Sequence, residues 1–345
     1  MTRTTLAVRI ERHGAPGVLA EREIPLADPG PGEVHLRTLA TGVNFADLLM
    51  RAGIYSTVPP MPYSPGFEVV GVVERVGGGV AEWREGDRAV ALVRHGGYAR
   101  DLIVPCRNLF RCPDGLGAAE AAAVPVAFLT AWVCLFDAGN AKRGETALVL
   151  NAAGGVGSAA VQLAVDAGLR VFGTAGATRK RDFVTRDLGA AACFETGGDW
   201  EAAVLAAGGP RCVDLALDAI GGKATASCRR LLAPLGRLVF YGLSDAMPGW
   251  RQNWLAMARA WIRTPRFHPL SLIEPNIGVF GVHLLHLQSR EEILRDRLER
   301  IYGLVMDGRV RPLVDRTFPL DRAGAVAAHE YIHGRQVIGK VVLTV

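Results

Sequence analysis

The chain has 345 residues, of which half are apolar and 21% are charged, and its net charge is +5. At roughly 100–200 residues per domain this length predicts about two domains, and the composition excludes a disordered or fibrous chain. Basic residues alternate with acids, and the densest basic run, at 179–181, has no interleaved aromatics. We therefore expect no nucleic-acid partner.

The cysteine pattern and the first residues predict a cytoplasmic protein. The six cysteines form no CxxC pair, and a chain of this length needs no disulfide staples, so we interpret them as reduced thiols. The first twelve residues show no signal peptide or lipidation signal. Residues 146–165 are uncharged and long enough to span a membrane, but Asn151, Gln162 and a glycine cluster interrupt them. We expect a strand, turn and helix there and no integral membrane segment.

Short apolar runs separated by glycine and proline turns extend to about Leu116 and are typical of a β-rich domain. The predicted strands are at 6–10, 34–40, 69–76, 88–92 and 102–104. The 41 glycines exceed the usual share of about 7%, and many of them fall at these turns.

From Ala118 the sequence becomes alanine-rich, and strands then alternate with helices. The predicted strands are at 147–151, 170–173, 191–194, 213–218 and 237–241, and the helices at 157–167, 179–188, 200–206 and 224–232. This alternation requires right-handed crossovers and a parallel, doubly wound sheet. It predicts a nucleotide-binding domain.

The chain after Gly242 is too short for a third domain, so we expect it to return to the first. It contains a segment rich in Trp, Met and Pro, whose Trp250, Trp254 and Trp261 either line a substrate cleft or pack in a core or dimer contact. A strand at 277–287, a helix at 290–306 and a strand at 337–345 follow. The expected domains are 1–126, completed by 267–345, and 127–266, with the active site in the cleft between them.

A glycine motif, Asn-Ala-Ala-Gly-Gly-Val-Gly at 151–157, lies between a predicted strand and a predicted helix. It places Gly154 and Gly157 at the second and third positions of a dinucleotide fingerprint, with Ala152 at the first. Small residues here let a pyrophosphate approach the backbone, and the helix N-terminus supplies N–H groups. The alternative is a tight structural turn.

The end of the second strand of this domain decides which cofactor is bound. NAD enzymes place an acidic residue there on the ribose 2′-hydroxyl, whereas this chain has Gly173–Gly176 followed by Arg179, Lys180 and Arg181. These cations suit a 2′-phosphate, so we predict NADPH rather than NADH. The alternative is an ordinary solvated helix start.

Several further motifs give the chain a resemblance that covers essentially its whole length. It resembles the zinc-free quinone oxidoreductase, or ζ-crystallin-like, branch of the medium-chain dehydrogenases/reductases, and within it the vesicle amine transport protein group, with polyketide enoyl reductases as relatives. The resemblance implies an α/β protein with a GroES-like catalytic domain and a Rossmann domain with a doubly wound parallel sheet. The motifs are Asn-Phe-Ala-Asp at 44–47, Arg-Ala-Gly-Ile-Tyr at 51–55, Pro-Gly-Phe-Glu-Val-Val-Gly at 65–71, Gly-Asp-Arg-Ala-Val at 86–90, Gly-Gly-Tyr-Ala at 96–99, the glycine motif and Gly-Lys-Val-Val-Leu at 339–343.

The same comparison implies that no metal is required. Zinc members of the superfamily carry a cysteine near the position of Asn44, where this chain has none. They also carry a histidine directly before a glutamate, where this chain has Phe67 before Glu68. Cys106 and Cys112 fall near the structural zinc lobe of those members, but two thiols do not close a tetrahedral site.

By resemblance, Asn44, Asp47 and Tyr55 line the nicotinamide side of the cleft as catalytic residues. For Asn44 and Asp47 the alternative is a cap on the helix that follows. Leu49 stands where the branch often has a tyrosine, so no role is assigned there.

The cofactor residues are also implied by resemblance. They are Thr130 beside the carboxamide; Gly154, Gly155, Val156, Thr174 and Lys180 on the phosphates; Tyr241 and Gly242 at the open sheet edge; and Phe280 in a strand that flanks the nicotinamide. Thr130 is alternatively a buried helix threonine bonded to its own backbone. In this branch the strand of Phe280 often pairs across a homodimer, and the alternative is a plain edge strand.

The implied reaction is hydride transfer from NADPH to a quinone or to the β-carbon of an enone, without metal. The proton comes from water or from Tyr55. One alternative is an enoyl-thioester reductase, in which Lys223 or Asp245 is the proton donor. An alternative of another class is a regulatory or structural NADPH-binding protein with little turnover.

Overall fold

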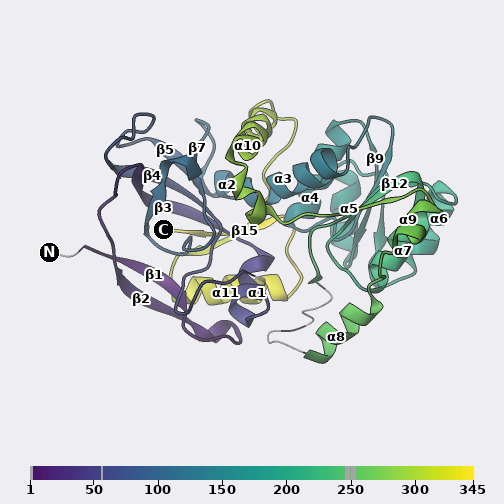
Figure 1. The fold of residues 1–345 in the computed structure, drawn as a ribbon, viewed down its shortest axis with the longest axis horizontal. Coiled ribbons are helices and arrows are strands. Elements are labelled where there is room, and N and C mark those ends of the chain that lie inside the picture. Colours follow the sequence, from purple (N-terminus) through teal and green to yellow (C-terminus); the bar gives the residue numbers. More distant parts are fainter. Residues whose placement is uncertain (1–2, 56, 245–248, 250–253) are drawn as a thin grey trace.

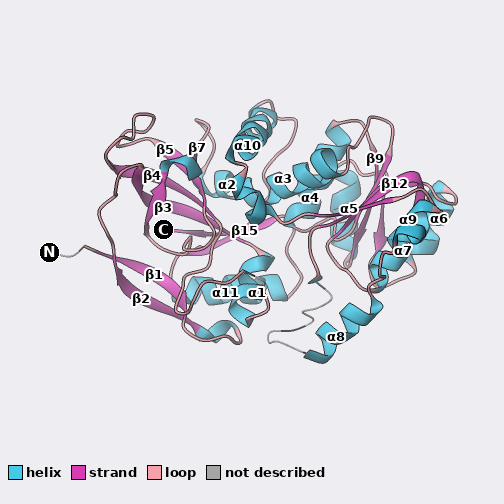
Figure 2. Cartoon of the chain, in the orientation of Figure 1, coloured by secondary structure: helices cyan, strands magenta, loops and turns pink. Residues whose placement is uncertain are grey.

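The computed structural model describes residues 3–55, 57–244, 249 and 254–345, which form two sheets with helices between and around them (Figure 1). The predicted α/β class, with a GroES-like domain and a Rossmann domain, is confirmed. Figure 2 shows the strands gathered into these two groups. Within the described residues, no helix is both long and apolar enough to cross a membrane.

The first sheet has seven strands and contains both early and late parts of the chain. Its order is β14-β15-β3-β4-β5-β7, with β6 also paired to β3, and only the β14–β15 pair is parallel. A separate antiparallel hairpin, β1–β2, accompanies it. The late strands therefore return to the first sheet. The bounds are β1 Thr4–Ile10, β2 Leu19–Pro25, β3 Glu33–Val43, β4 Glu68–Val76, β5 Arg88–Leu92, β6 Asp101–Pro105, β7 Leu109–Arg111, β14 Val314–Pro319 and β15 Lys340–Thr344.

The second sheet has six parallel strands in the order β10-β9-β8-β11-β12-β13. Numbered within this sheet the order is 3-2-1-4-5-6, which is the doubly wound order of dinucleotide-binding domains. The bounds are β8 Thr146–Val149, β9 Arg170–Ala175, β10 Ala192–Glu195, β11 Val213–Asp218, β12 Leu232–Phe240 and β13 Gly278–Gly281. Because β13 follows residue 266, the range expected for this domain does not contain the whole sheet.

Helices cover both faces of the parallel sheet. Ala147 and Val149 of β8 belong to one apolar cluster with α3 and α4, whereas Leu148 and Leu150 belong to another with α6 and α7, as the two-residue period of a strand requires. The helix bounds are α1 Phe45–Ala52, α2 Ala118–Ala122, α3 Pro125–Trp132, α4 Gly155–Asp166, α5 Thr178–Arg186, α6 Trp200–Gly208, α7 Lys223–Leu231, α8 Trp254–Arg263, α9 Pro269–Ile273, α10 Glu291–Met306 and α11 Arg322–His333.

The apolar core is continuous between the two sheets. One cluster of buried residues includes Val70 and Val90 of the first sheet together with Ala147 of the second. Helices α2, α3 and α10 lie between the sheets (Figure 1), and the Tyr302 hydroxyl of α10 donates to the Ala121 carbonyl at 3.3 Å. The two sheets are thereby packed into one body through these helices.

One local expectation was wrong, and one strand was missed. The strand predicted at 277–287 ends at Gly281, because its neighbour β12 ends at Phe240; the Val282 N–H makes the last bond of this ladder, to the Phe240 carbonyl. The chain then enters a short 3-10 helix, η5 Leu284–Ser289. Strand β2 was not predicted, because the charged residues at 21–23 interrupt its apolar residues and it pairs only with β1.

Candidate cofactor and active site

The glycine motif forms a tight loop between β8 and α4. Asn151 holds a left-handed backbone, with φ 55°, and its N–H donates to the Thr174 hydroxyl at 3.2 Å. A Cβ atom on Gly157 would lie 2.2 Å from the Asn151 carbonyl oxygen, so only glycine allows this approach of helix to loop. Gly154 is the N-cap of α4, and no side chain caps the helix. The first-turn N–H groups are thus available for an anion, and a pyrophosphate fits here.

Four cations lie near the end of β9: Arg179, Lys180 and Arg181 of α5, and Arg335. Lys180 is 8% exposed, and burial lowers the pKa of its ammonium group; nearby Asp315 opposes this shift, while Arg179 and Arg335 add to it. At Gly176, just after β9, a Cβ atom would meet nothing within 4 Å. Open space beside a buried lysine at this strand end fits a 2′-phosphate.

The C-terminal segment contacts the glycine loop. Gly339 donates its N–H to the Ala153 carbonyl at 2.8 Å and forms a parallel bridge with Gly154. A Cβ atom on Gly155 would lie 3.0 Å from the Lys340 side chain. Since Lys340 begins β15 of the first sheet, the loop of one sheet and a strand of the other meet at this point.

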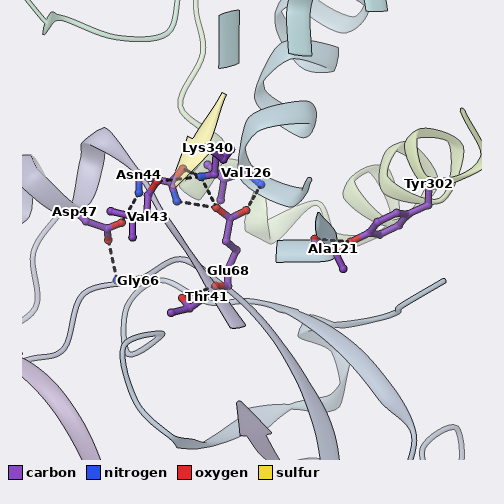
Figure 3. Close-up of polar contacts among 10 residues, drawn as sticks. All are labelled: Thr41, Val43, Asn44, Asp47, Gly66, Glu68, Ala121, Val126, Tyr302 and Lys340. Atoms are coloured by element: carbon purple, nitrogen blue, oxygen red, sulfur yellow. Dashed lines mark hydrogen bonds and ion pairs between the residues drawn. The ribbon is translucent and has the colours of Figure 1, made fainter. Parts of the chain in front are cut away.

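Glu68 and Lys340 form a buried ion pair that holds Asn44 (Figure 3). The Glu68 Oε1 atom accepts from Lys340 Nζ at 2.7 Å and from Asn44 Nδ2 at 2.9 Å, and Oε2 accepts from the Val126 N–H at 2.7 Å. Lys340 Nζ also donates to Asn44 Oδ1 at 2.7 Å and to the Val43 carbonyl at 3.2 Å. The side chains of Glu68 and Lys340 are 0% and 5% exposed. The Asn44 amide is therefore fixed at both of its polar atoms.

The residues at this position do not fit a catalytic zinc ion. Asn44 and Phe67 supply neither a thiolate nor an imidazole, which are the donors zinc prefers. Of the two nearby carboxylates, that of Glu68 is already neutralised by Lys340 and that of Asp47 accepts two backbone N–H bonds. Within the part of the chain that the structure describes, no three His, Cys, Asp or Glu side chains gather in a group able to hold a metal ion.

Asp47 makes the contacts of a helix cap. Its Oδ2 accepts from the Asn44 N–H and its Oδ1 from the Gly66 N–H, both at 2.8 Å, and the residue is completely buried. Burial raises the pKa of this carboxyl to about 7, against the lowering effect of the two N–H donors and Lys340. These contacts match the capping alternative for Asp47, whereas the Asn44 side chain bonds Glu68 and Lys340 instead.

Tyr55 lies in the loop after α1 and meets a residue of the other sheet's domain. Its ring centroid is 5.9 Å from that of Phe67 and 5.6 Å from that of His283. Burial, and then the charge of Asp47, raise the pKa of the phenol to about 12. At neutral pH the hydroxyl is protonated and can donate a hydrogen bond.

The other predicted residues are spread around this site. Thr130 is buried in α3. Tyr241 follows β12, with its hydroxyl 3.5 Å from the Leu150 carbonyl, and Gly242 next to it is exposed. Phe280 is 52% exposed in the edge strand β13.

Of the two proton donors considered for the alternative reaction, Lys223 lies among the described residues and Asp245 does not. Lys223 is exposed at the first position of α7. Asp245, together with Trp250 and the side chains of Trp254 and Trp261, lies outside the described residues.

Four residues near the site were not among those predicted from the sequence: Glu68, Lys340, Arg335 and His283. For Glu68 and Lys340 a signal existed, because each charge begins a strand and is followed directly by an uncharged, mostly apolar run, at 69–73 and 341–343. A charge in a buried strand is rarely left unpaired. Arg335 and His283 carry no such signal, since their neighbours become apparent only in three dimensions.

Comparison with known proteins places the chain in a family. Residues 30–133 match the family described as "Alcohol dehydrogenase GroES-like domain", and residues 188–343 match "Zinc-binding dehydrogenase". The human synaptic vesicle membrane protein VAT-1 homolog is 37% identical over 320 residues, covering 91% of this chain and 79% of that protein. The chain belongs to the medium-chain dehydrogenase/reductase family.

Solved structures of this family have the same fold. The quinone oxidoreductase of Thermus thermophilus, solved alone and with NADPH, is 36% identical with a TM-score of 0.80, covering 99% of this chain and all of that one. The CurK enoyl reductase is 25% identical with a TM-score of 0.82, covering 99% of each chain. This medium-chain dehydrogenase/reductase is thus an oxidoreductase that fits the quinone oxidoreductase branch near VAT-1 proteins.

Proposed function

We propose that the protein is an NADPH-dependent reductase that transfers a hydride to quinones or to activated C=C bonds of enones without a metal ion. The observation that carries the proposal is the buried Lys180 in the first turn of α5, the helix that follows β9. The end of β9 itself has no carboxylate that could bind a 2′-hydroxyl. Support comes from the related quinone oxidoreductase that was solved with NADPH.

The chain's own residues would hold the cofactor at three points. The N-terminus of α4, at Gly154, Gly155 and Val156, takes the pyrophosphate, and Lys180 with Arg179 takes the 2′-phosphate. Thr174 supports the loop through Asn151. When bound, NADPH supplies the hydride.

The first sheet supplies the acceptor side of the site. The Glu68–Lys340 pair orients Asn44, and preorganised polar groups of this kind favour the charge that develops during reduction. Tyr55 keeps its proton at neutral pH, so its hydroxyl donates a hydrogen bond to the acceptor oxygen while solvent supplies the proton.

An acceptor panel tests this function. NADPH oxidation is measured with 1,4-quinones, simple enones and crotonyl thioesters in one preparation. Faster turnover of quinones or enones supports the proposal, whereas a preference for crotonyl thioesters favours the enoyl-thioester reductase suggested by the likeness to CurK. NADPH binding without turnover of any acceptor would contradict both enzyme functions and favour the regulatory or structural NADPH-binding protein.

The cofactor assignment is tested with Lys180→Met, which keeps a buried unbranched apolar side chain and removes the charge. We expect NADPH affinity to fall about tenfold or more, because one charge-assisted contact is lost, while NADH affinity stays unchanged. Arg186→Met at the end of the same helix is the control. Equal loss of both cofactors in Lys180→Met would contradict the assignment.

We further propose a cytoplasmic homodimer. The six cysteines are free, as expected for a reducing compartment. The β13 edge with its exposed Phe280 provides a strand that a second copy can extend.

A further inference from the structure

His283 stands at the carboxyl edge of the parallel sheet. It follows β13 by two residues, after Val282 has made the last ladder bond to Phe240. The glycine loop after β8 and Gly242 after β12 leave the sheet at the same edge, which is where ligands of such sheets bind.

The His283 ring joins the two domains. Its centroid lies 5.6 Å from that of Tyr55, tilted by 35°, and 4.5 Å from that of His286. Tyr55 comes from the loop after α1 and in turn contacts Phe67. His283 therefore brings the carboxyl edge of the parallel sheet into ring contact with Tyr55 of the first domain.

Both nitrogens of His283 are shielded from solvent and have no hydrogen-bond partner in any other described residue. Buried polar atoms in this state cost stability, and a native protein retains them where another molecule satisfies them. Burial, followed by the neighbouring His286, lowers the pKa of the imidazole, against the raising effect of the residue's own backbone. The ring is thus neutral at pH 7 and offers one N–H donor.

We propose that His283 binds the acceptor, donating its N–H to the carbonyl oxygen of a flat, conjugated quinone or enone that enters between His283 and Tyr55. The acceptor replaces the ring contact with Tyr55 and satisfies the buried donor. This inference rests on the proposed reductase function and names the residue that selects its acceptor.

The proposed role agrees with the electron balance of the reaction. The hydride carries two electrons to the conjugated carbon of the acceptor, and solvent supplies the proton. His283 keeps its own proton and stabilises the negative charge that grows on the acceptor oxygen.

The test compares His283→Phe, which keeps an aromatic ring and removes both nitrogens, with His286→Phe, a change to the adjacent exposed ring. Tetramethyl-1,4-benzoquinone is the probe, because its ring has no open position for the protein's cysteines to attack. We expect His283→Phe to raise the melting temperature, since two unsatisfied buried atoms disappear, and to raise the Kd and KM for the quinone about tenfold. The KM for NADPH should not change.

His286→Phe should leave the quinone Kd and KM unchanged, and His283→Gln, which keeps an N–H donor, should recover part of the affinity. The inference is overturned if His283→Phe binds the quinone as tightly as the wild type, if it is less stable than the wild type, or if both phenylalanine variants lose affinity equally.

Quinone binding to the NADP⁺-loaded protein, measured by calorimetry, separates the two proposals. A wild type that binds the quinone without oxidising NADPH refutes the proposed reductase function. The ratio of the quinone Kd values of His283→Phe and wild type then still decides the role of His283. A wild type that turns over acceptors while His283→Phe matches it refutes only the inference. A wild type that neither binds nor reduces the quinone overturns both.

Discussion

The Glu68–Lys340 pair shows how one buried charge depends on another. The two residues are far apart in the chain, and their side chains are 0% and 5% exposed. Desolvation of two charges offsets much of their attraction, so the pair adds little net stability, but removing one partner leaves a buried charge without compensation.

We predict that Lys340→Met lowers the free energy of unfolding by about 3–5 kcal/mol. The double variant Glu68→Gln with Lys340→Met should recover much of this loss, because no buried charge remains. The control is Arg309→Met, which breaks the surface pair with Asp166, where Arg309 is 52% exposed, and should cost at most about 1 kcal/mol. Urea denaturation measures all three, and an equal cost for Lys340→Met and Arg309→Met would contradict the argument.

Asp47 predicts a pH dependence of stability. Burial raises its pKa in the folded protein to about 7, whereas an aspartate in the unfolded chain titrates near 3.9. Between these two values the folded state binds a proton that the unfolded state does not. The free energy of unfolding should therefore fall as the pH rises from about 4 to about 7, and the Asp47 contribution should then level off.

Denaturant unfolding at several pH values from 4 to 8 checks this prediction. Asp47→Asn removes the titrating group. The free energy of unfolding of the variant should therefore rise relative to that of the wild type as the pH rises from 4 to 7. A difference that stays constant over this range would show that the Asp47 pKa is not raised.

At the scale of elements, the contact between β8 and α4 depends on the absence of a side chain. Gly157→Ala places a methyl group 2.2 Å from the Asn151 carbonyl oxygen, and this oxygen belongs to backbone that has little freedom to move. We predict a loss of about 1–3 kcal/mol in the free energy of unfolding and about tenfold weaker NADPH binding, because the loop that takes the pyrophosphate is displaced.

Gly303→Ala is the matched control. Gly303 lies in α10, and a Cβ atom there meets nothing within 4 Å. This variant should gain about 0.5–1 kcal/mol, since alanine favours a helix more than glycine does. If Gly157→Ala bound NADPH as tightly as Gly303→Ala, the glycine loop would not be the phosphate site.

Elements with a strong periodic pattern were predictable from the sequence, and those defined by a neighbour were not. β11 was predicted with its observed bounds at 213–218, and α10 differs by one residue at its start. The end of β13 was missed, because it is set by the end of β12 rather than by the residues at 282–287.

At the scale of the whole molecule, the parallel sheet has two edge strands, β10 and β13. β13 is the last strand in its order, and Phe280 is 52% exposed on it. We predict that the protein is a dimer in light scattering and that Phe280→Lys makes it a monomer, because two like charges would meet across the joined edges.

The control for this experiment is Leu205→Lys, a similar change at a 39% exposed residue of α6, which should remain dimeric. A wild type that elutes as a monomer, or a Phe280→Lys variant that remains a dimer, would show that β13 does not join two copies.

The sequence by itself determined the two-sheet architecture, the glycine loop at 151–157 and the family, because these depend on local periodicity, turn residues and short motifs. Only the tertiary structure decided that Lys340 neutralises Glu68, that Asp47 also accepts from the Gly66 N–H, and that the rings of His283 and Tyr55 meet. These contacts join residues far apart in the chain, and burial, not sequence spacing, sets their charge and hydrogen bonding.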